Sequence, residues 1–214
     1  YVLNLEVVLP TGEIIWTGAN VLKNATGYDL TALMIGSEGT LGVITTIVFR
    51  LIPLPTKDIT MLVPFSSVEK ACEAVSAVFR AGITPSALEF IERDAIDWTL
   101  KYTDVKLQIH DDVKAHLLVE VDGNDMDILY KDCERIFEVM EGFECGEILL
   151  ADSESQKNQI WKLRRAIGEA VKSNSIYKEE DTVVPRAELA KLLKGVKVIG
   201  KDYGFQSVCY GHAG

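Results

Sequence analysis

The chain has 214 residues, of which 48% are hydrophobic and 25% charged, with 16 glycines and 6 prolines. This is the composition of a packed soluble protein of one or two domains, and it excludes collagen-like, disordered and disulfide-stapled chains. Lysine and arginine number 22 against 32 aspartate and glutamate residues, which gives a formal charge of −10. Nucleic-acid binders need surplus cations to neutralise phosphates, so the charge balance argues against that class.

The four cysteines are far apart and form no C-x-x-C pair: Cys72, Cys133, Cys145 and Cys209. Cys72 and Cys133 fall on the apolar faces of expected helices, where a free thiol behaves as a small hydrophobic side chain. This pattern favours a reducing compartment, and we expect a cytoplasmic protein. No apolar run approaches the ~18 residues of a transmembrane helix, so no segment is expected to span a bilayer.

The chain begins with a pattern typical of a small β-rich unit. Leucine and valine alternate with polar residues over 3–9, turn residues follow at 10–13, and an apolar return at 14–16 completes a predicted hairpin. Residues 43–52 are rich in β-branched side chains and predict a buried strand. Two prolines then mark residues 53–58 as the expected domain boundary. Both ends of the sequence are expected to be cuts through a larger fold.

From residue 56 onward, short strands alternate with amphipathic helices. We expect strands at 61–65, 86–91, 116–121, 146–150, 181–185 and 206–210, and helices at 68–79, 93–101, 126–140, 154–172 and 187–199. Ser66 and Glu69 form a capping box at the start of the first of these helices. Because each helix has one apolar face, the order predicts an α+β, ferredoxin-like domain: a mostly antiparallel sheet with helices on one face.

Glycines concentrate between residues 18 and 42, and the core of this stretch is Gly36-Ser-Glu-Gly-Thr-Leu-Gly42. Glycine lets the main chain approach a ligand closely and adopt positive φ. Successive exposed N–H groups can then form a concavity that binds anions. Turns and strand bulges also recruit glycine, so the spacing alone leaves a purely structural role open.

The longer string NATGYDL-x-x-L-x-x-GSEGTLGVIT, residues 24–45, is more specific. It resembles the FAD-binding segment of the PCMH-type, or vanillyl-alcohol-oxidase-type, flavoproteins, which include glycolate oxidase catalytic subunits, D-lactate dehydrogenases and D-2-hydroxyglutarate dehydrogenases. The resemblance implies that residues 1–55 are the C-terminal portion of an FAD-binding domain and 56–214 most of a substrate-binding domain. It also implies FAD contact, mostly through the backbone, by Gly36, Ser37, Glu38, Gly39, Thr40, Leu41, Gly42, Val43 and Ile44.

Two cationic residues are candidates for binding a substrate carboxylate. Trp161-Lys-Leu-Arg164 resembles the W-x-x-R pattern of the family's substrate helix. By helical spacing, Arg164 lies at the boundary of the core, where its planar fork could clamp a carboxylate or extend to solvent. The resemblance favours the clamp. Lys178 precedes a segment that is similar to the family's E-D-x-x-V-P strand, and is a second substrate-binding candidate.

The final residues, Tyr210-Gly-His-Ala-Gly214, resemble the start of the family motif G-H-x-G-D-G-N-x-H. In the metal-dependent branch, two histidines and a later glutamate hold a divalent metal such as Zn, Mn or Fe. The resemblance makes His212 the first ligand, but one side chain cannot close such a site. His110 and His116 fit no motif and are expected to be structural.

Taken together, the resemblance implies part of an FAD-dependent enzyme that oxidises a small D-2-hydroxy acid, such as glycolate or D-lactate, by hydride transfer to flavin. An electron-acceptor protein or a quinone would be a further partner, and no catalytic base is identified. We expect the isolated 214 residues to bind FAD weakly or not at all and to show no turnover. Two alternatives remain: a non-catalytic ligand-binding module, and an interaction module of an electron-transfer complex, which the acidic composition would suit.

Overall fold

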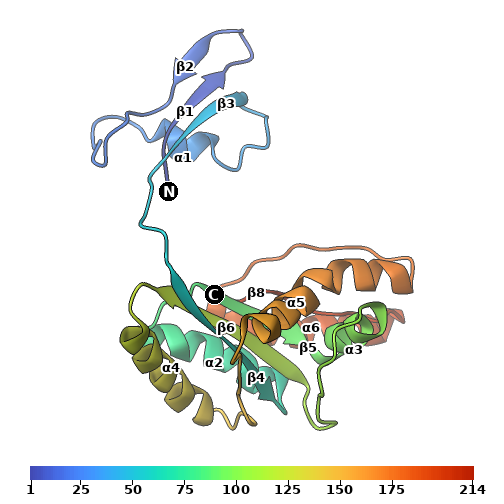
Figure 1. Cartoon of the computed structure of the whole chain (residues 1–214). Coiled ribbons are helices and arrows are strands. Elements are labelled where there is room, and N and C mark those ends of the chain that lie inside the picture. The colour runs from blue at the N-terminus through green and yellow to red at the C-terminus, as the bar shows by residue number, and fades with distance from the viewer. The chain divides into compact units, whose positions relative to one another are not determined.

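The computed structural model describes residues 1–214 and divides into two compact units, Tyr1–Leu54 and Pro55–Gly214 (Figure 1). The division falls inside the proline-containing stretch at 53–58. Each unit has a sheet and a hydrophobic core of its own. None of the helices combines the length and the apolar character that crossing a membrane requires.

The first unit is a small antiparallel sheet in the order β2-β1-β3. Its elements are β1 (Val2–Val8), β2 (Ile14–Trp16), the short helix α1 (Leu30–Met34) and β3 (Val43–Phe49). The expected hairpin at the start of the chain is present as the pair β1–β2. The strand expected at 43–52 was predicted to be buried, and this is wrong: it ends at Phe49 and most of its side chains are exposed. β3 forms an edge of the sheet, so its β-branched residues reflect strand propensity and not burial on both faces.

The second unit contains an antiparallel sheet in the order β7-β4-β6-β5-β8. The strands are β4 (Lys57–Phe65), β5 (Ala87–Glu92), β6 (Ala115–Gly123), β7 (Leu149–Leu150) and β8 (Tyr210–His212). The two longest strands, β4 and β6, pair along their full length at the centre of the sheet. This confirms the mixed α and β composition and the antiparallel sheet expected from the sequence.

Helices cover both faces of this sheet, so the expectation of helices on one face is wrong. The helices are α2 (Val68–Arg80), α3 (Arg93–Tyr102), α4 (Met126–Glu141), α5 (Glu154–Asn174) and α6 (Leu189–Tyr203), the last preceded by a 3-10 turn, η1 (Arg186–Glu188). On β6, Leu117 and Val119 belong to one core and Leu118 to another. Since the central strands are apolar on both faces, each face must be covered to exclude water.

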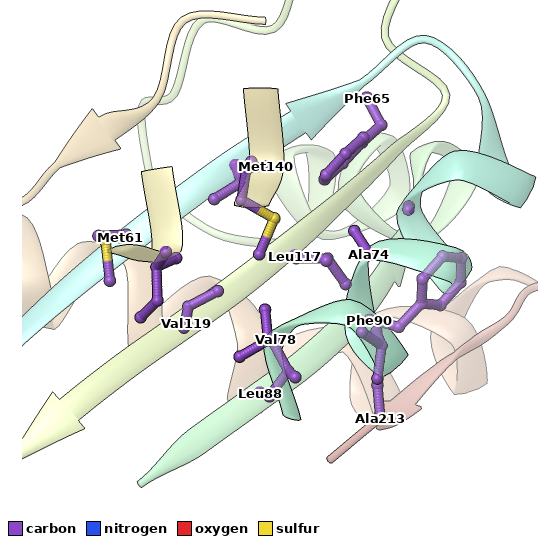
Figure 2. Close-up of a cluster of buried hydrophobic side chains, with 14 of the residues drawn as sticks. Met61, Phe65, Ala74, Val78, Leu88, Phe90, Leu117, Val119, Met140 and Ala213 are labelled. Atoms are coloured by element: carbon purple, nitrogen blue, oxygen red, sulfur yellow. The ribbon is translucent and has the colours of Figure 1, made fainter. Parts of the chain in front are cut away.

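The larger core lies between the sheet and helices α2 and α4. Figure 2 shows Phe65 of β4 and Leu117 of β6 together with Val78 of α2 and Met140 of α4. The opposite face packs against α3 and α5, for example through Leu163 of α5. That second face carries the polar groups described below.

Local differences from the sequence-based expectations have simple causes. Residues 181–185 form no strand, because this exposed segment has no neighbouring strand with which to pair. The strand expected at 206–210 begins only at Tyr210. The N-cap of α2 is Ser67, not Ser66, since its hydroxyl accepts a hydrogen bond from the backbone N–H of Lys70.

Candidate functional site

Helix α5 is joined to the sheet by polar contacts along one of its faces. Three of its side chains each contact a carboxylate on a different strand: Lys157 with Asp58 on β4, Trp161 with Glu120 on β6, and Arg164 with Glu89 on β5. Spacings of four and three residues place these side chains on one face of the helix. The strand order β4-β6-β5 places their carboxylate partners in the same sequence. The helix therefore crosses the sheet in a defined register.

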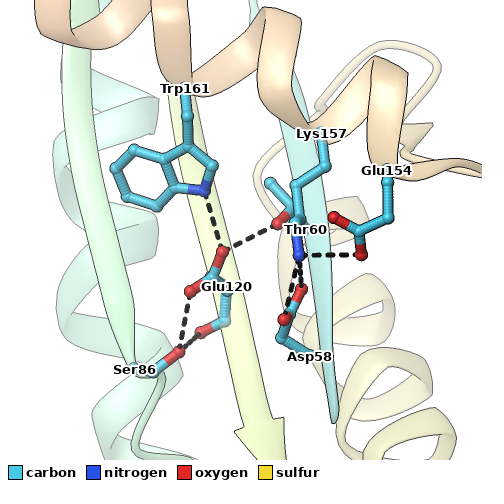
Figure 3. A network of polar contacts seen from close by, with 7 residues as sticks. All are labelled: Asp58, Thr60, Ser86, Glu120, Glu154, Lys157 and Trp161. Carbon is cyan, nitrogen blue, oxygen red and sulfur yellow. Dashed lines mark hydrogen bonds and ion pairs between the residues drawn. The ribbon is translucent and has the colours of Figure 1, made fainter. Parts of the chain in front are cut away.

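Glu120 is the centre of the middle contact (Figure 3). Its Oε2 accepts hydrogen bonds from the indole Nε1 of Trp161 at 2.8 Å and from Oγ1 of Thr60 at 2.9 Å. Ser86 donates to the backbone oxygen of Glu120 at 3.1 Å. These partners belong to strand β4, to helix α5 and to the turn before β5, so this half-buried carboxylate attaches α5 to the sheet.

Arg164 and Glu89 form a largely buried ion pair on the next strand. Nε and Nη2 of Arg164 donate to the same oxygen, Oε2 of Glu89, at 3.0 and 2.7 Å. The exposed fractions of the two side chains are 15% and 6%. The guanidinium also lies over the ring of Tyr210, 5.5 Å from its centroid. The Nη1 group of Arg164 has no protein acceptor, so hydrogen-bond donors remain for an external anion.

His212 lies on the other side of the same carboxylate. It is directly opposite Glu89 on the neighbouring strand β8, and its Nδ1 is 2.6 Å from Oε1 of Glu89. The carboxylate can only accept a hydrogen bond, so Nδ1 carries the proton. The histidine side chain is otherwise 85% exposed, which leaves Nε2 accessible.

Tyr210 completes this cluster from the same strand. Burial raises the pKa of its hydroxyl, and the negative charge of Glu179 raises it further, while Arg164 acts in the opposite direction. The phenol is therefore a neutral hydrogen-bonding group at physiological pH.

Lys178 is not brought into this cluster by any direct contact. Its side chain is exposed and forms an ion pair with Glu180 at 3.4 Å. The segment from 175 to 185 contains neither helix nor strand. Its role in substrate binding stays a prediction.

The glycine-rich segment at 36–44 is mostly open to solvent. Gly36 and Gly39 have φ values of +80° and +79°, and a Cβ atom on either would meet nothing within 4 Å. Glu38 between them also has positive φ, +49°. The backbone N–H groups of Glu38 and Gly39 donate to no carbonyl of the chain. An exposed turn with free N–H groups fits the backbone contacts expected for a dinucleotide.

Gly42 has a different reason to be glycine. A Cβ atom here would lie 2.6 Å from Cγ1 of Val7 and 2.9 Å from the carbonyl oxygen of Val8. The residue is buried against β1, so its lack of a side chain permits close packing at the start of β3. The regular spacing of the glycines thus combines two open turn positions with one packing position.

The residues of this chain do not form a metal site on their own. Across residues 1–214, no group of three or more histidine, cysteine, aspartate or glutamate side chains is placed to hold a metal ion. Both oxygens of Glu89 are engaged by Arg164 and His212. His212 as a metal ligand therefore stays a prediction, and no step of the chemistry below depends on a metal.

Sequence reasoning did not identify Glu89 and Glu120. Each is the single carboxylate in a strand segment that is mostly apolar, SALEFI for Glu89 and HLLVEV for Glu120. A carboxylate in such a strand needs a hydrogen-bond donor or a cation as its partner. This requirement could have indicated that Glu89 and Glu120 contact the helix that carries Trp161 and Arg164.

Comparison with known proteins identifies the second unit. Residues 54–214 match the family model described as FAD linked oxidases, C-terminal domain. The chain belongs to the FAD-linked oxidases. Family membership implies FAD as the cofactor, and it confirms the family resemblance inferred from the sequence.

Curated relatives of this FAD-linked oxidase match along its whole length. It is 35% identical to a D-lactate dehydrogenase of Anaerostipes hadrus, over 100% of this chain and 46% of the relative. It is 34% identical to the glycolate oxidase subunit GlcD of Bacillus subtilis, over 100% of this chain and 45% of the relative. The chain thus spans about half the length of these relatives.

Solved structures share the fold at low sequence identity. A 4-ethylphenol oxidase from Gulosibacter chungangensis matches with a TM-score of 0.65 and 14% identity, over 98% of this chain and 48% of that one. An alkyldihydroxyacetonephosphate synthase matches with a TM-score of 0.59 and 17% identity, over 94% and 40% of the two chains. These neighbours establish the architecture alone.

Proposed function

We propose that this FAD-linked oxidase is part of an enzyme that oxidises a small D-2-hydroxy acid such as D-lactate or glycolate. Two curated relatives named for these activities support the substrate class. The observation that carries the proposal is the state of Arg164, which is held by Glu89 yet keeps its Nη1 donors uncommitted. The exposed imidazole of His212 contacts the other oxygen of the Glu89 carboxylate.

Arg164 is the group that would bind the substrate carboxylate. A guanidinium presents its donors in a rigid plane that matches the two oxygens of a carboxylate. Because Glu89 and the Tyr210 ring already orient this plane, little conformational freedom is lost on binding. Lys178 is the second candidate for the same anion.

Oxidation of a 2-hydroxy acid to a 2-oxo acid removes a hydride from C2 and a proton from the hydroxyl group. When bound, FAD supplies the hydride acceptor, and residues 36–44 are proposed to contact it through their backbone. The residues of the second unit bind and orient the acid, which favours one alignment of the C2–H bond. The accessible Nε2 of His212 is available to the hydroxyl end of the substrate.

The test uses the protein expressed from its complete reading frame, since its curated relatives are about twice the length of this chain. Bound flavin is monitored by absorbance without oxygen while D-lactate, L-lactate or glycolate is added. We expect the D-acid or glycolate to bleach the oxidised flavin and to yield one equivalent of 2-oxo acid.

Replacing Arg164 with lysine should raise the KM for the acid, because a point charge cannot reproduce the bidentate fork. Flavin that stays oxidised with every 2-hydroxy acid would contradict the proposal. Saturable binding of the acid without flavin reduction would instead support a ligand-binding module.

A further inference from the structure

We propose that Glu89 is the positioning residue of this site: one carboxylate sets both the orientation of Arg164 and the tautomer of His212. The relevance to substrate rests on the function proposed above. The structural part concerns only residues of this chain and can be tested without substrate, FAD or metal.

The two oxygens of Glu89 have separate partners. Oε2 accepts both hydrogen bonds from Arg164, through Nε and Nη2, while Oε1 lies against Nδ1 of His212. The carboxylate is thus shared between helix α5 and strand β8. Neither partner can rotate freely without giving up a charge-assisted hydrogen bond.

On the side of Arg164, the geometry determines which donors remain. Engaging Nε and one N–H of Nη2 leaves the outer edge of the guanidinium, including Nη1, directed away from Glu89. Because Nε also donates a hydrogen bond to Glu89, the plane of the guanidinium group is fixed as well. A substrate carboxylate would therefore meet a donor edge that is already oriented.

On the side of His212, the geometry determines where the lone pair lies. Because Nδ1 donates to Glu89, the neutral imidazole must carry its lone pair on Nε2. That lone pair is the group that can accept a proton or bind a cation. Carboxylate partners are known to fix histidine ligands in this way, and their loss typically weakens affinity or activity by roughly 10- to 100-fold.

The location of Glu89 suits a positioning role. Its side chain is buried, and β5 pairs with β6 on one side and with β8 on the other. Glu120 offers a matched comparison, since it is a carboxylate on the same face of the sheet, held by the same helix. Its partners are Trp161, Thr60 and Ser86, and it touches neither Arg164 nor His212.

We predict that the substitution Glu89→Gln inverts the tautomer of His212. A glutamine can keep its carbonyl oxygen on Arg164 and turn its amide NH₂ toward His212. Nδ1 would then have to accept, so the proton would move to Nε2 and the tautomer would invert. In the wild-type protein, the same argument requires that the neutral ring be protonated on Nδ1.

The experiment is NMR of the imidazole nitrogens in isotopically labelled protein, at a pH where the ring of His212 is neutral. The chain has 3 histidines, and the resonances lost in His212→Asn identify the relevant ring. We expect Nδ1–H in wild type, Nε2–H in Glu89→Gln, and the wild-type pattern in the control Glu120→Gln. In the complete enzyme, Glu89→Gln should also lower kcat/KM for the hydroxy acid by roughly 10- to 100-fold.

Wild-type protein with the proton on Nε2, or a tautomer that Glu89→Gln leaves unchanged, would overturn the role of Glu89. The wild-type measurement decides this even if the variant does not fold. A wild-type enzyme that turns over no hydroxy acid would overturn the proposed function, while the tautomer measurement would still decide the role of Glu89.

Discussion

The side chains of Glu89 and His212 face each other across strands β5 and β8, with Oε1 of the first 2.6 Å from Nδ1 of the second. Arg164 reaches the same carboxylate from helix α5. The predicted anion clamp and the predicted metal ligand are therefore connected through a residue that neither motif contains.

The buried pair of Arg164 and Glu89 should show strong thermodynamic coupling. The substitution Arg164→Met leaves the buried carboxylate without its cation, and we expect the free energy of unfolding to fall by roughly 3–5 kcal/mol. The double substitution Arg164→Met with Glu89→Gln removes the unpaired charge and should recover part of this loss. Urea unfolding of the single and double variants measures the coupling, and additive effects would contradict it.

Comparing alanine substitutions at Gly39 and Gly12 should distinguish a loss of flavin contact from the cost of backbone strain. Both have positive φ, +79° and +84°, and at both a Cβ atom would meet nothing within 4 Å. Alanine at either position should therefore cost a similar ~1 kcal/mol of stability. In the complete protein, Gly39→Ala should also weaken FAD binding by about tenfold, or ~1.4 kcal/mol, whereas Gly12→Ala should not.

Flavin titration monitored by absorbance or fluorescence checks this difference, with thermal unfolding as the measure of stability. Equal FAD affinity in the two variants would remove the support for backbone contact at Gly39.

The indole N–H of Trp161 should contribute measurably to the attachment of α5. Phenylalanine retains much of the packing but cannot donate to Glu120. Loss of a hydrogen bond to a charged group should lower the free energy of unfolding by about 2 kcal/mol. Trp98→Phe on α3, outside this network, is the control, and an equal loss in both variants would attribute the effect to packing.

His116 should make the protein less stable in acid. Its side chain is 3% exposed, its Nδ1 has no partner, and burial followed by the charge of Arg93 lowers its pKa from 6.5 to about 4. The unfolded state then binds more protons between these values, so the stability contributed by neutral His116 is complete above pH 6.5 and is lost as the pH falls toward 4. This loss should reach about 3 kcal/mol.

The measurement is the free energy of unfolding as a function of pH for wild type and His116→Leu. The difference between the two curves isolates the histidine from the carboxylates, which also titrate in acid. Parallel curves between pH 4 and 6.5 would show that His116 is not held neutral by the fold.

The amino-acid sequence was sufficient to predict features encoded in one contiguous segment. The family was indicated by the string at 24–45, and most helices followed from apolar residues at helical spacing. The turn at 36–39 also depends on local backbone conformation, which glycine at two of these positions makes accessible. Such features need no knowledge of distant residues.

The tertiary structure alone decided which side chains meet. Glu89, Arg164 and His212 come from β5, α5 and β8, and only the pairing of the strands and the path of α5 across the sheet bring them together. For a related reason the sequence did not predict that helices cover both faces of the sheet. An apolar residue in a strand shows that its side chain is buried, but it does not identify the element that packs against it. Periodicity identifies the buried face of one element, whereas contacts between elements depend on register and packing, which are properties of the whole fold.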